Sequence, residues 1–306
     1  MRSLALLGLA VVACGKPTPA QPIYQATVAP PARGFQLVGP EIDIPAGQEQ
    51  QWCTPFEPLA HETTVVALEG YQAPGGHHVA LFTLTKSFKP GAYRCDGSEG
   101  ALDMVNWRFV DGVNAGIAHK LPDGVALTIS AGKTLMMQSH YVAGKDPIRV
   151  RDVLNVIAGD PGQKYIQANY WLVGDVNIRI PVGPSYQTAA NCTLDANINV
   201  LDVRGHTHQY GNLFQLDLTR AGAGSSDQLY RETNGLLMRN DPPRKSYPID
   251  APLPLKAGDT LRYTCGWSNT TDHAIQFPEE MCQGLLLYYP SKGFVDCNAG
   301  STVVLE

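Results

Sequence analysis

Several features are scarce or missing in this chain of 306 residues, and each absence excludes a class of protein. Lys and Arg number 23 against 28 Asp and Glu, and no basic run could follow a phosphate backbone, so nucleic acid is not an expected partner. No two cysteines have CxxC spacing, which removes zinc ribbons and thioredoxin-like redox motifs. The apolar run at residues 4–13 is too short to span a bilayer.

Charged residues are also few, at 17%, whereas the sequence has 30 Gly and 23 Pro. That balance favours many short strands joined by tight turns over amphipathic helices, so we predict an all-β fold. A chain of this length suits two domains with a core each, and we expect two antiparallel β-sandwiches in tandem. The segments with strand-like sequences are 63–68, 77–84, 134–142, 165–173, 198–204, 213–218, 260–264 and 284–289.

The connection between the two domains is expected within residues 174–184. This stretch follows an apolar run, Trp171-Leu172-Val173, and ends in a loop that contains Gly, Pro and Ser. We therefore assign residues 34–176 to the N-terminal domain and residues 177–306 to the C-terminal domain.

The N-terminus is typical of an exported protein. Residues 1–14 have a basic residue, an apolar run and then Ala13-Cys14-Gly15, which resembles a bacterial lipobox. We expect this signal peptide to be removed and Cys14 to be lipidated, giving a membrane-anchored lipoprotein of the periplasm or cell surface whose only membrane contact is the anchor. A plain secretory signal and a secreted protein are the alternative. Residues 15–33, rich in Pro, Ala, Gln and Thr, are expected to be a flexible tether.

The six remaining cysteines form an even number in an exported chain, so three disulfides are predicted. Their spacing favours one disulfide that closes a short loop late in the chain. The other four cysteines then form one pair early in the chain and one pair that brackets the second half. The predicted pairs are Cys53 with Cys95, Cys192 with Cys297 and Cys265 with Cys282.

Two groups of residues have the donor atoms of metal sites. In His206-Thr207-His208 the alternation of an extended strand can point both imidazoles at one ion, and Met281 in Glu279-Glu280-Met281-Cys282 would add a soft sulfur. Two imidazoles with a thioether favour copper, especially Cu(I). Upstream lie His77-His78 and, in Gln138-Ser139-His140-Tyr141, a third imidazole. Two sites rather than one indicate redox chemistry.

Adjacent residues on a regular strand point to opposite faces, so His77 and His78 can bind one ion only if the strand twists, bulges or ends there. Gly75-Gly76 just before them makes such a departure feasible. Single histidines are more often structural than metal-binding, and we leave His61, His119 and His273 out of the sites.

The order of these motifs resembles the copper type II, ascorbate-dependent monooxygenases, the family of peptidylglycine α-hydroxylating monooxygenase and dopamine β-monooxygenase. The resemblance covers roughly residues 35–290: the paired histidines, Gln-x-His-Tyr, His-Thr-His, and Glu-Met-Cys followed by a strand ending Tyr-Tyr-Pro. It implies two jelly-roll domains with one copper each, facing a shared cleft. It also implies the same three disulfide pairs.

The resemblance assigns roles to particular residues. His77, His78 and His140 would hold the electron-supplying copper, and His206, His208 and Met281 the copper that meets O2 and substrate. The cofactors would be two copper ions, with O2 and ascorbate or another one-electron reductant consumed. Gln138 matches a residue near the first copper, and Arg204 matches an arginine that holds the substrate carboxylate in the peptide-amidating branch.

The substrate is not identified by the sequence. After Cys282 the chain has Gln283-Gly284-Leu285, where the amidating branch has a Tyr that assists carboxylate binding, and Leu285 cannot donate that hydrogen bond. Arg204 is equally explained as a partner in a structural ion pair. We therefore predict a monomeric copper monooxygenase that hydroxylates a C–H bond of a small-molecule or peptide substrate. The alternatives are a non-catalytic copper-binding or copper-storage lipoprotein, and a β-sandwich scaffold with structural zinc.

Overall fold

The computed structural model describes residues 24–25, 28–86, 88, 91–96, 106–114, 118–277 and 279–305. Strands account for 58% of the structure and helix for 2%, which confirms the all-β prediction. The signal peptide at residues 1–14, with Cys14, lies outside the described residues. Within the predicted tether, Tyr24–Gln25 form strand β1 and pair in parallel with β12. The tether as a whole stays a prediction. No helix in the described ranges is long and apolar enough to cross a membrane.

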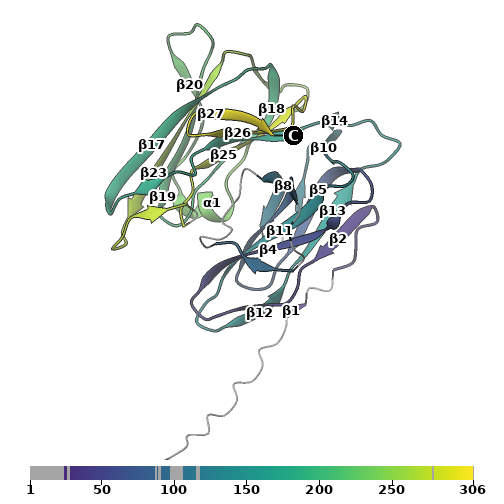
Figure 1. The fold of residues 1–306 in the computed structure, drawn as a ribbon. Coiled ribbons are helices and arrows are strands. Elements are labelled where there is room, and N and C mark those ends of the chain that lie inside the picture. Colours follow the sequence, from purple (N-terminus) through teal and green to yellow (C-terminus); the bar gives the residue numbers. More distant parts are fainter. Residues whose placement is uncertain are drawn as a thin grey trace, which may run out of the picture.

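The earlier half of the chain forms three sheets (Figure 1, purple to teal). A five-stranded sheet has the order β7 (Tyr93–Arg94), β4 (Glu49–Pro58), β11 (Thr134–Val142), β6 (Gly76–Leu84), β8 (Trp107–Asn114). A six-stranded sheet has the order β14 (Ile166–Gln167), β10 (Val125–Ile129), β5 (Thr63–Tyr71), β13 (Val153–Ala158), β2 (Gly34–Val38), with β9 (Ala118–Lys120) also on β5. The small third sheet is β1, β12 (Ile148–Arg151) and β3 (Ile42–Ile44).

The later half has a large sheet, a second sheet packed on it and a short ribbon (Figure 1, green to yellow). The seven-stranded sheet has the order β21 (Lys245–Ser246), β18 (Ile198–His206), β25 (Gln283–Tyr289), β15 (Asn169–Gly174), β26 (Phe294–Asn298), β27 (Ser301–Leu305), with β22 (Leu253–Leu255) also on β18. The four-stranded sheet is β17 (Gly183–Thr193), β23 (Thr260–Asn269), β19 (Gly211–Thr219), β20 (Ser226–Glu232). The ribbon pairs β16 (Arg179–Ile180) with β24 (Ile275–Gln276).

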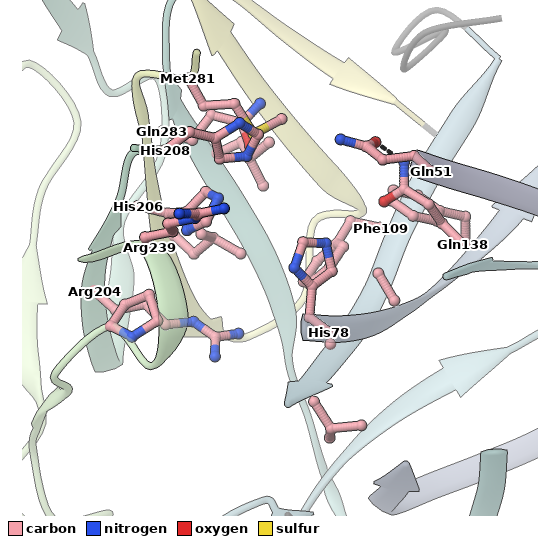
Figure 2. Close-up of a pocket in the computed structure, with 17 residues that line it drawn as sticks. Gln51, His78, Phe109, Gln138, Arg204, His206, His208, Arg239, Met281 and Gln283 are labelled. Carbon is pink, nitrogen blue, oxygen red and sulfur yellow. Dashed lines mark hydrogen bonds between the residues drawn. The ribbon is translucent and has the colours of Figure 1, made fainter. Parts of the chain in front are cut away.

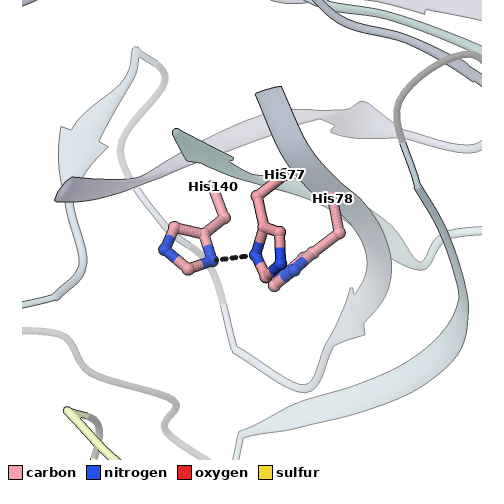
Figure 3. A group of neighbouring side chains, drawn as sticks. All are labelled: His77, His78 and His140. Atoms are coloured by element: carbon pink, nitrogen blue, oxygen red, sulfur yellow. Dashed lines mark hydrogen bonds between the residues drawn. The ribbon is translucent and has the colours of Figure 1, made fainter. Parts of the chain in front are cut away.

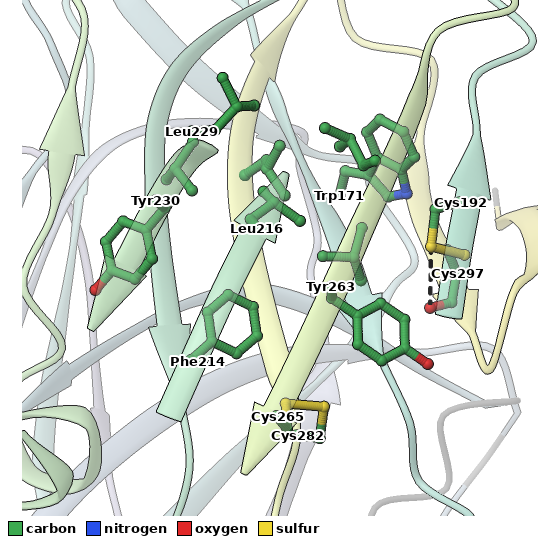
Figure 4. Packing of buried hydrophobic residues seen from close by; sticks show 14 of the residues in the cluster. Trp171, Cys192, Phe214, Leu216, Leu229, Tyr230, Tyr263, Cys265, Cys282 and Cys297 are labelled. Carbon is green, nitrogen blue, oxygen red and sulfur yellow. Dashed lines mark hydrogen bonds between the residues drawn. A yellow bond between two sulfur atoms is a disulfide. The ribbon is translucent and has the colours of Figure 1, made fainter. Parts of the chain in front are cut away.

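Burial along these strands builds one main core in each half, and among the described residues the earlier half has two smaller apolar clusters as well. In the later half Trp171, Phe214 and Tyr263 from different strands pack together with no more than 2% of their surface exposed (Figure 4). The seven-stranded sheet also contributes Leu172 and Leu287 to the core of the earlier half. The two groups of sheets therefore share apolar contacts, which fix how the motif-bearing strands face each other.

The structure forms the three predicted disulfides. All eight predicted strand segments are strands, although the segment at 165–173 is divided into β14 and β15. β15 pairs with β25 and β26 of the later half, and the division at residue 176 with a jelly roll on each side stays a prediction. The short helix α1 (Gly235–Asn240), capped by the Asn234 side chain, was not predicted.

Candidate metal centre

The first histidine group is built by two neighbouring strands and a bulge. His140 on β11 pairs with His78 on β6, whereas the next residue, Tyr141, pairs with Gly76. His77 is therefore the extra residue of a β-bulge, which turns it toward the same side as His78. Gly75 supports this bend with a φ of 92°, a conformation that side-chain-bearing residues rarely adopt. The departure from a regular strand that the sequence required is present.

The three imidazoles of this group converge (Figure 3). One ring nitrogen from each of His77, His78 and His140 can be chosen so that all lie within 4.8 Å of one another. The Nδ1 atoms of His77 and His140 are 3.1 Å apart. Two nitrogens each about 2.0–2.1 Å from one tetrahedral ion would be separated by about 3.3 Å. The arrangement fits a single metal ion with little movement.

Side chains hold the outer nitrogens of two of these rings. His140 Nε2 lies 2.8 Å from Glu49 Oε1, and His77 Nε2 lies 2.8 Å from Asn240 Oδ1. Arg239 donates to the other oxygen of Glu49 at 3.3 Å. Partners of this kind fix the orientation of a ligating imidazole and leave the opposite nitrogen, here Nδ1, for the ion. Arg239 and Asn240 belong to α1, so the later half of the chain helps to orient the first group.

The second group lies at the end of β18 and in a distant loop. His206 ends the strand, Thr207 is fully buried, and His208 follows in a turn, as expected for a spacer between two ligands. His206 Nδ1 is 2.8 Å from the Met238 carbonyl and His208 Nδ1 is 3.1 Å from the Glu279 carbonyl. Each Nδ1–H can therefore donate to a backbone oxygen, which leaves Nε2 for a metal.

His208 Nε2 is buried and has no hydrogen-bond partner among the described residues. Buried polar atoms are nearly always paired, so an orphaned imidazole nitrogen requires an explanation. His206, His208 and Met281 line the same cavity, and Figure 2 shows the three side chains together on one side of it. A metal ion bound by this set would satisfy the orphaned atom.

The Glu280 carboxylate fixes the backbone around the second group. Fully buried, it accepts hydrogen bonds from the backbone N–H groups of His208 (2.9 Å), Tyr210 (2.5 Å) and Met281 (3.2 Å) and from Trp267 Nε1 (3.0 Å). The disulfide from Cys282 to Cys265 then ties the Met281 loop to β23. The sequence motif around Met281 contains Glu280 but does not indicate this role.

Burial lowers the pKa of all five histidines in the two groups. Loss of solvation is the largest cause in each, and neighbouring imidazoles add to it for His78, His140 and His206. The pKa of His208 falls to about 4. These rings are neutral at physiological pH, which is the form that binds metals.

The two groups lie next to each other, and His78 of the first group and both imidazoles of the second line a cavity of about 130 Å³ (Figure 2). The ring centroids of His78 and His206 are 6.3 Å apart, and those of His140 and His208 are 5.9 Å apart. Gln138, one of the predicted residues, also lines the cavity and donates to Gln51 Oε1 at 3.1 Å. On another side, His140 and His208 line a wider pocket of about 600 Å³ with more polar walls.

Arg204 lines the cavity but already has a partner. Its guanidinium lies 3.4 Å from Asp111 Oδ1, and both side chains are buried. Asp111 also accepts from Tyr170 at 3.0 Å and contacts His119. Burial opposes ionisation of Asp111, but the nearby charges of His119 and Arg204 outweigh it and lower its pKa to about 2. The ion pair that the sequence left open as an alternative is formed, and a role for Arg204 in substrate binding stays a prediction.

The histidines assigned no metal role contact other groups. His119 joins the Asp111 cluster and also contacts Arg244. His273 lies at the surface beside Asp272 and Glu279, where their hydrogen bonds raise its pKa. Sequence reasoning missed Glu49, Asn240 and Asp111, because they reach the site only through the tertiary fold.

Comparison with known proteins gives one family. Residues 171–303 match the model of the C-terminal domain of copper type II ascorbate-dependent monooxygenases. The matched segment contains His206, His208 and Met281 but not the first histidine group. No curated protein matches the chain.

Among solved structures, the chain is similar to the turret protein A223 of Sulfolobus turreted icosahedral virus, with 12% identity over 83% of this chain and 96% of that one and a TM-score of 0.20. A structure of infectious bursal disease virus, Gx strain, shows 10% identity over 84% and 72%, with a TM-score of 0.21. The PBSX exported protein XepA shows 9% identity over 85% and 89%, with a TM-score of 0.22.

Proposed function

We propose that the chain is a copper-dependent monooxygenase that hydroxylates a C–H bond of a small-molecule or peptide substrate with O2 and a reductant such as ascorbate. The observation that carries this proposal is the pair of neutral imidazole groups lying next to each other beside one cavity, with the second group inside the segment that matches the monooxygenase family. Two copper ions would supply the redox chemistry, because insertion of one oxygen atom into a C–H bond takes two electrons and each ion stores one.

The donor atoms suit two copper sites of different character. His77, His78 and His140 would hold the first ion through three imidazoles, a set that accommodates both copper oxidation states. His206 and His208 would hold the second through Nε2, and the thioether of Met281 would favour Cu(I). In four of these rings the nitrogen that would not bind copper already has a hydrogen-bond partner. These partners would keep the other nitrogen of each ring directed at the metal position before an ion binds.

The walls of the cavity would position the substrate and exclude water. Gln51 and Gln138 line the cavity and offer polar contacts, and Phe82, Phe109 and Leu285 line it with apolar surface. The wider pocket on the other side of His140 and His208 would let a soluble reductant reach the imidazoles without entering the substrate cavity. Separate access for reductant and substrate is consistent with a reaction that consumes both.

Copper content and oxygen uptake test the proposal. The purified protein loaded with copper should hold about two ions per chain and consume O2 only with ascorbate and a substrate, because each imidazole group supplies one ion's ligands. Copper binding with no ascorbate-dependent uptake over a broad substrate library would support the storage alternative. Zinc bound in preference to copper would support a scaffold.

The three disulfides indicate an oxidising compartment, as in exported proteins. We propose that the protein is held to a membrane through lipidated Cys14. Growth with a labelled fatty acid should label the wild type but not the Cys14→Ser variant, and globomycin should cause the precursor to accumulate. Absence of both effects would leave a secreted protein instead.

A further inference from the structure

A histidine and a carboxylate at the surface border the wider pocket and belong to neither histidine group. His273 Nε2 lies 3.5 Å from Glu279 Oε2, and the two side chains are 57% and 48% exposed. Both line the pocket of about 600 Å³, which is also lined by His140 and His208. These two imidazoles are only 1% and 4% exposed. The pocket therefore extends from an exposed pair of donor atoms to buried imidazoles of both groups.

The exposed pair has the geometry of two ligands of one ion. Two donor atoms each about 2.0–2.2 Å from a tetrahedral ion would be separated by about 3.4 Å, close to the 3.5 Å between His273 Nε2 and Glu279 Oε2. His273 Nδ1 lies 2.9 Å from Asp272 Oδ1, so its N–H can donate there and leave Nε2 for a metal. Imidazole nitrogen and carboxylate oxygen both suit Cu(II).

A site of this kind would hold copper weakly. It has two protein ligands and stands open to water, whereas each histidine group deeper in the protein offers three donor atoms. An ion captured at the surface would therefore be bound more tightly once it moved inward. Weak binding is what an entry site requires, because the ion must be able to leave it.

Glu279 also connects the exposed pair to the second group. Its backbone carbonyl lies 3.1 Å from His208 Nδ1, and its carboxylate faces His273. His208 Nε2 is buried without a hydrogen-bond partner among the described residues. One residue therefore supplies a carboxylate at the surface and holds a buried imidazole that can receive the ion.

The charged residues favour this route for a cation over the substrate cavity. The described residues that line the cavity include two guanidinium groups and no carboxylate, whereas those that line the wider pocket include three carboxylates and one guanidinium. Glu49 and Asp96 have arginine partners, while Glu279 faces His273. Carboxylates that line a cleft attract cations and raise their rate of association. A copper ion should therefore approach through the wider pocket.

We propose that His273 and Glu279 form an entry site that captures Cu(II) at the mouth of the wider pocket and delivers it to the buried imidazoles of the two histidine groups. The inference rests on the proposed function for the presence of copper in those groups. It assigns a role to a histidine whose sequence context left it outside the metal sites.

The rate of copper loading tests the delivery. Metal-free protein is mixed with a weak Cu(II)–glycine complex, the reaction is stopped with EDTA at set times, and the copper retained after desalting is measured. The variant His273→Gln/Glu279→Gln should load about tenfold more slowly than the wild type and reach the same final copper content. The matched control, His61→Gln/Glu57→Gln, changes two exposed residues that are not among those lining the pocket and should load like the wild type.

Equilibrium dialysis tests the capture. Wild-type protein with both groups loaded, dialysed against excess Cu(II), should hold about one more ion per chain than His273→Gln/Glu279→Gln, and the control should match the wild type. Equal loading rates of variant and wild type, or equal copper content in dialysis, overturns the proposal. A lower final copper content of the variant in the loading experiment also overturns it, because the pair would then support a final site and not an entry site.

The outcomes separate this inference from the proposed function. Failure of the function appears as copper without ascorbate-dependent oxygen uptake, while the difference in loading rate persists. Failure of the inference appears as equal loading rates in a protein whose copper content and oxygen uptake are intact.

Discussion

The two histidine groups orient their imidazole rings in opposite ways. In the first group, His77 and His140 direct Nδ1 inward, and the side chains of Asn240 and Glu49 hold Nε2. In the second group His206 and His208 direct Nε2 inward, and backbone carbonyls hold Nδ1. The first orientation depends on replaceable side chains, whereas the second depends on the path of the backbone.

This difference has a structural consequence. The partners of the first group come partly from α1 in the later half, so the group is fully oriented only when both halves are packed together. The second group is contained within the later half, where the buried Glu280 carboxylate and a disulfide fix the loops. Substitution of a side chain that hydrogen-bonds the outer ring nitrogens should therefore disturb the imidazole orientation in the first group. The second group has no such side chain to lose, because backbone carbonyls hold its outer nitrogens.

The largest expected effect comes from removing the donor that only the second group has. Met281→Leu keeps the side-chain volume but removes the sulfur, and it should lower ascorbate-dependent oxygen uptake at least about a thousandfold, as should Met281→Ala. Copper at the first group should remain. Copper analysis and oxygen uptake on each variant measure the two effects.

Retention of full activity by Met281→Leu would contradict the assignment of the thioether as a ligand. Loss of activity in Met281→Ala but not in Met281→Leu would show that only the volume of the side chain matters.

The next prediction concerns the Glu280 side chain, which holds the backbone around the second histidine group. Glu280→Ala leaves the N–H groups of His208, Tyr210 and Met281 buried without an acceptor, and it should lower the free energy of unfolding by at least about 3 kcal/mol. The neighbouring Glu279→Ala removes a half-exposed side chain and should cost less than about 1 kcal/mol. Urea unfolding of both variants makes the comparison. Equal stabilities would show that the buried carboxylate does not fix these loops.

A smaller effect is expected at the outer partners of the first group. Asn240→Ala removes the contact to His77 Nε2 and should weaken copper at the first group by about 10–100-fold, with no change at the second. Leu236→Ala on the same helix changes a side chain that is 66% exposed and is the matched control. Competition with a copper chelator measures both affinities. If Asn240→Ala binds copper like the control, α1 does not orient the first group.

The smallest effect concerns pH. Burial raises the pKa of Asp152, a neighbour of Ser139 behind the first group, to about 7. Between the ordinary carboxyl pKa of about 4 and pH 7 the folded protein keeps a proton on Asp152 that the unfolded chain has lost, so the contribution of Asp152 to stability falls as pH rises, by at most about 1.4 kcal/mol per pH unit. The lowered pKa values of the five buried histidines act in the opposite direction, so the effect of Asp152 is the difference between the wild type and Asp152→Asn.

Denaturant unfolding at about pH 5 and about pH 8 checks the slope. In the later half, burial raises the pKa of Asp296 to about 6. The contribution of Asp296 to the pH dependence of stability should therefore be complete at a lower pH than that of Asp152. A difference in stability between the wild type and Asp152→Asn that is the same at both pH values would contradict the raised pKa of Asp152.

The strands were predictable from the sequence because they depend on local patterns, whereas the role of the histidines as metal ligands stays a prediction. Alternation and turn residues located the eight strands, and Gly75-Gly76 before His77 predicted the departure from regular pairing that appears as a bulge. The outer partners were not predictable. Asn240 is 163 residues from His77 and Arg204 is 93 from Asp111, and no periodicity relates such positions. Helix α1 is only six residues long and too short for an amphipathic pattern.

If the two groups bind two copper ions with different donors, X-ray absorption at the copper edge of the reduced, fully loaded protein should show the difference, because sulfur and nitrogen neighbours scatter differently. We expect about one sulfur neighbour for every two copper ions in the wild type and none in Met281→Leu, with the imidazole scattering largely kept. A sulfur signal that persists in Met281→Leu, or its absence from the wild type, would show that Met281 is not a copper ligand.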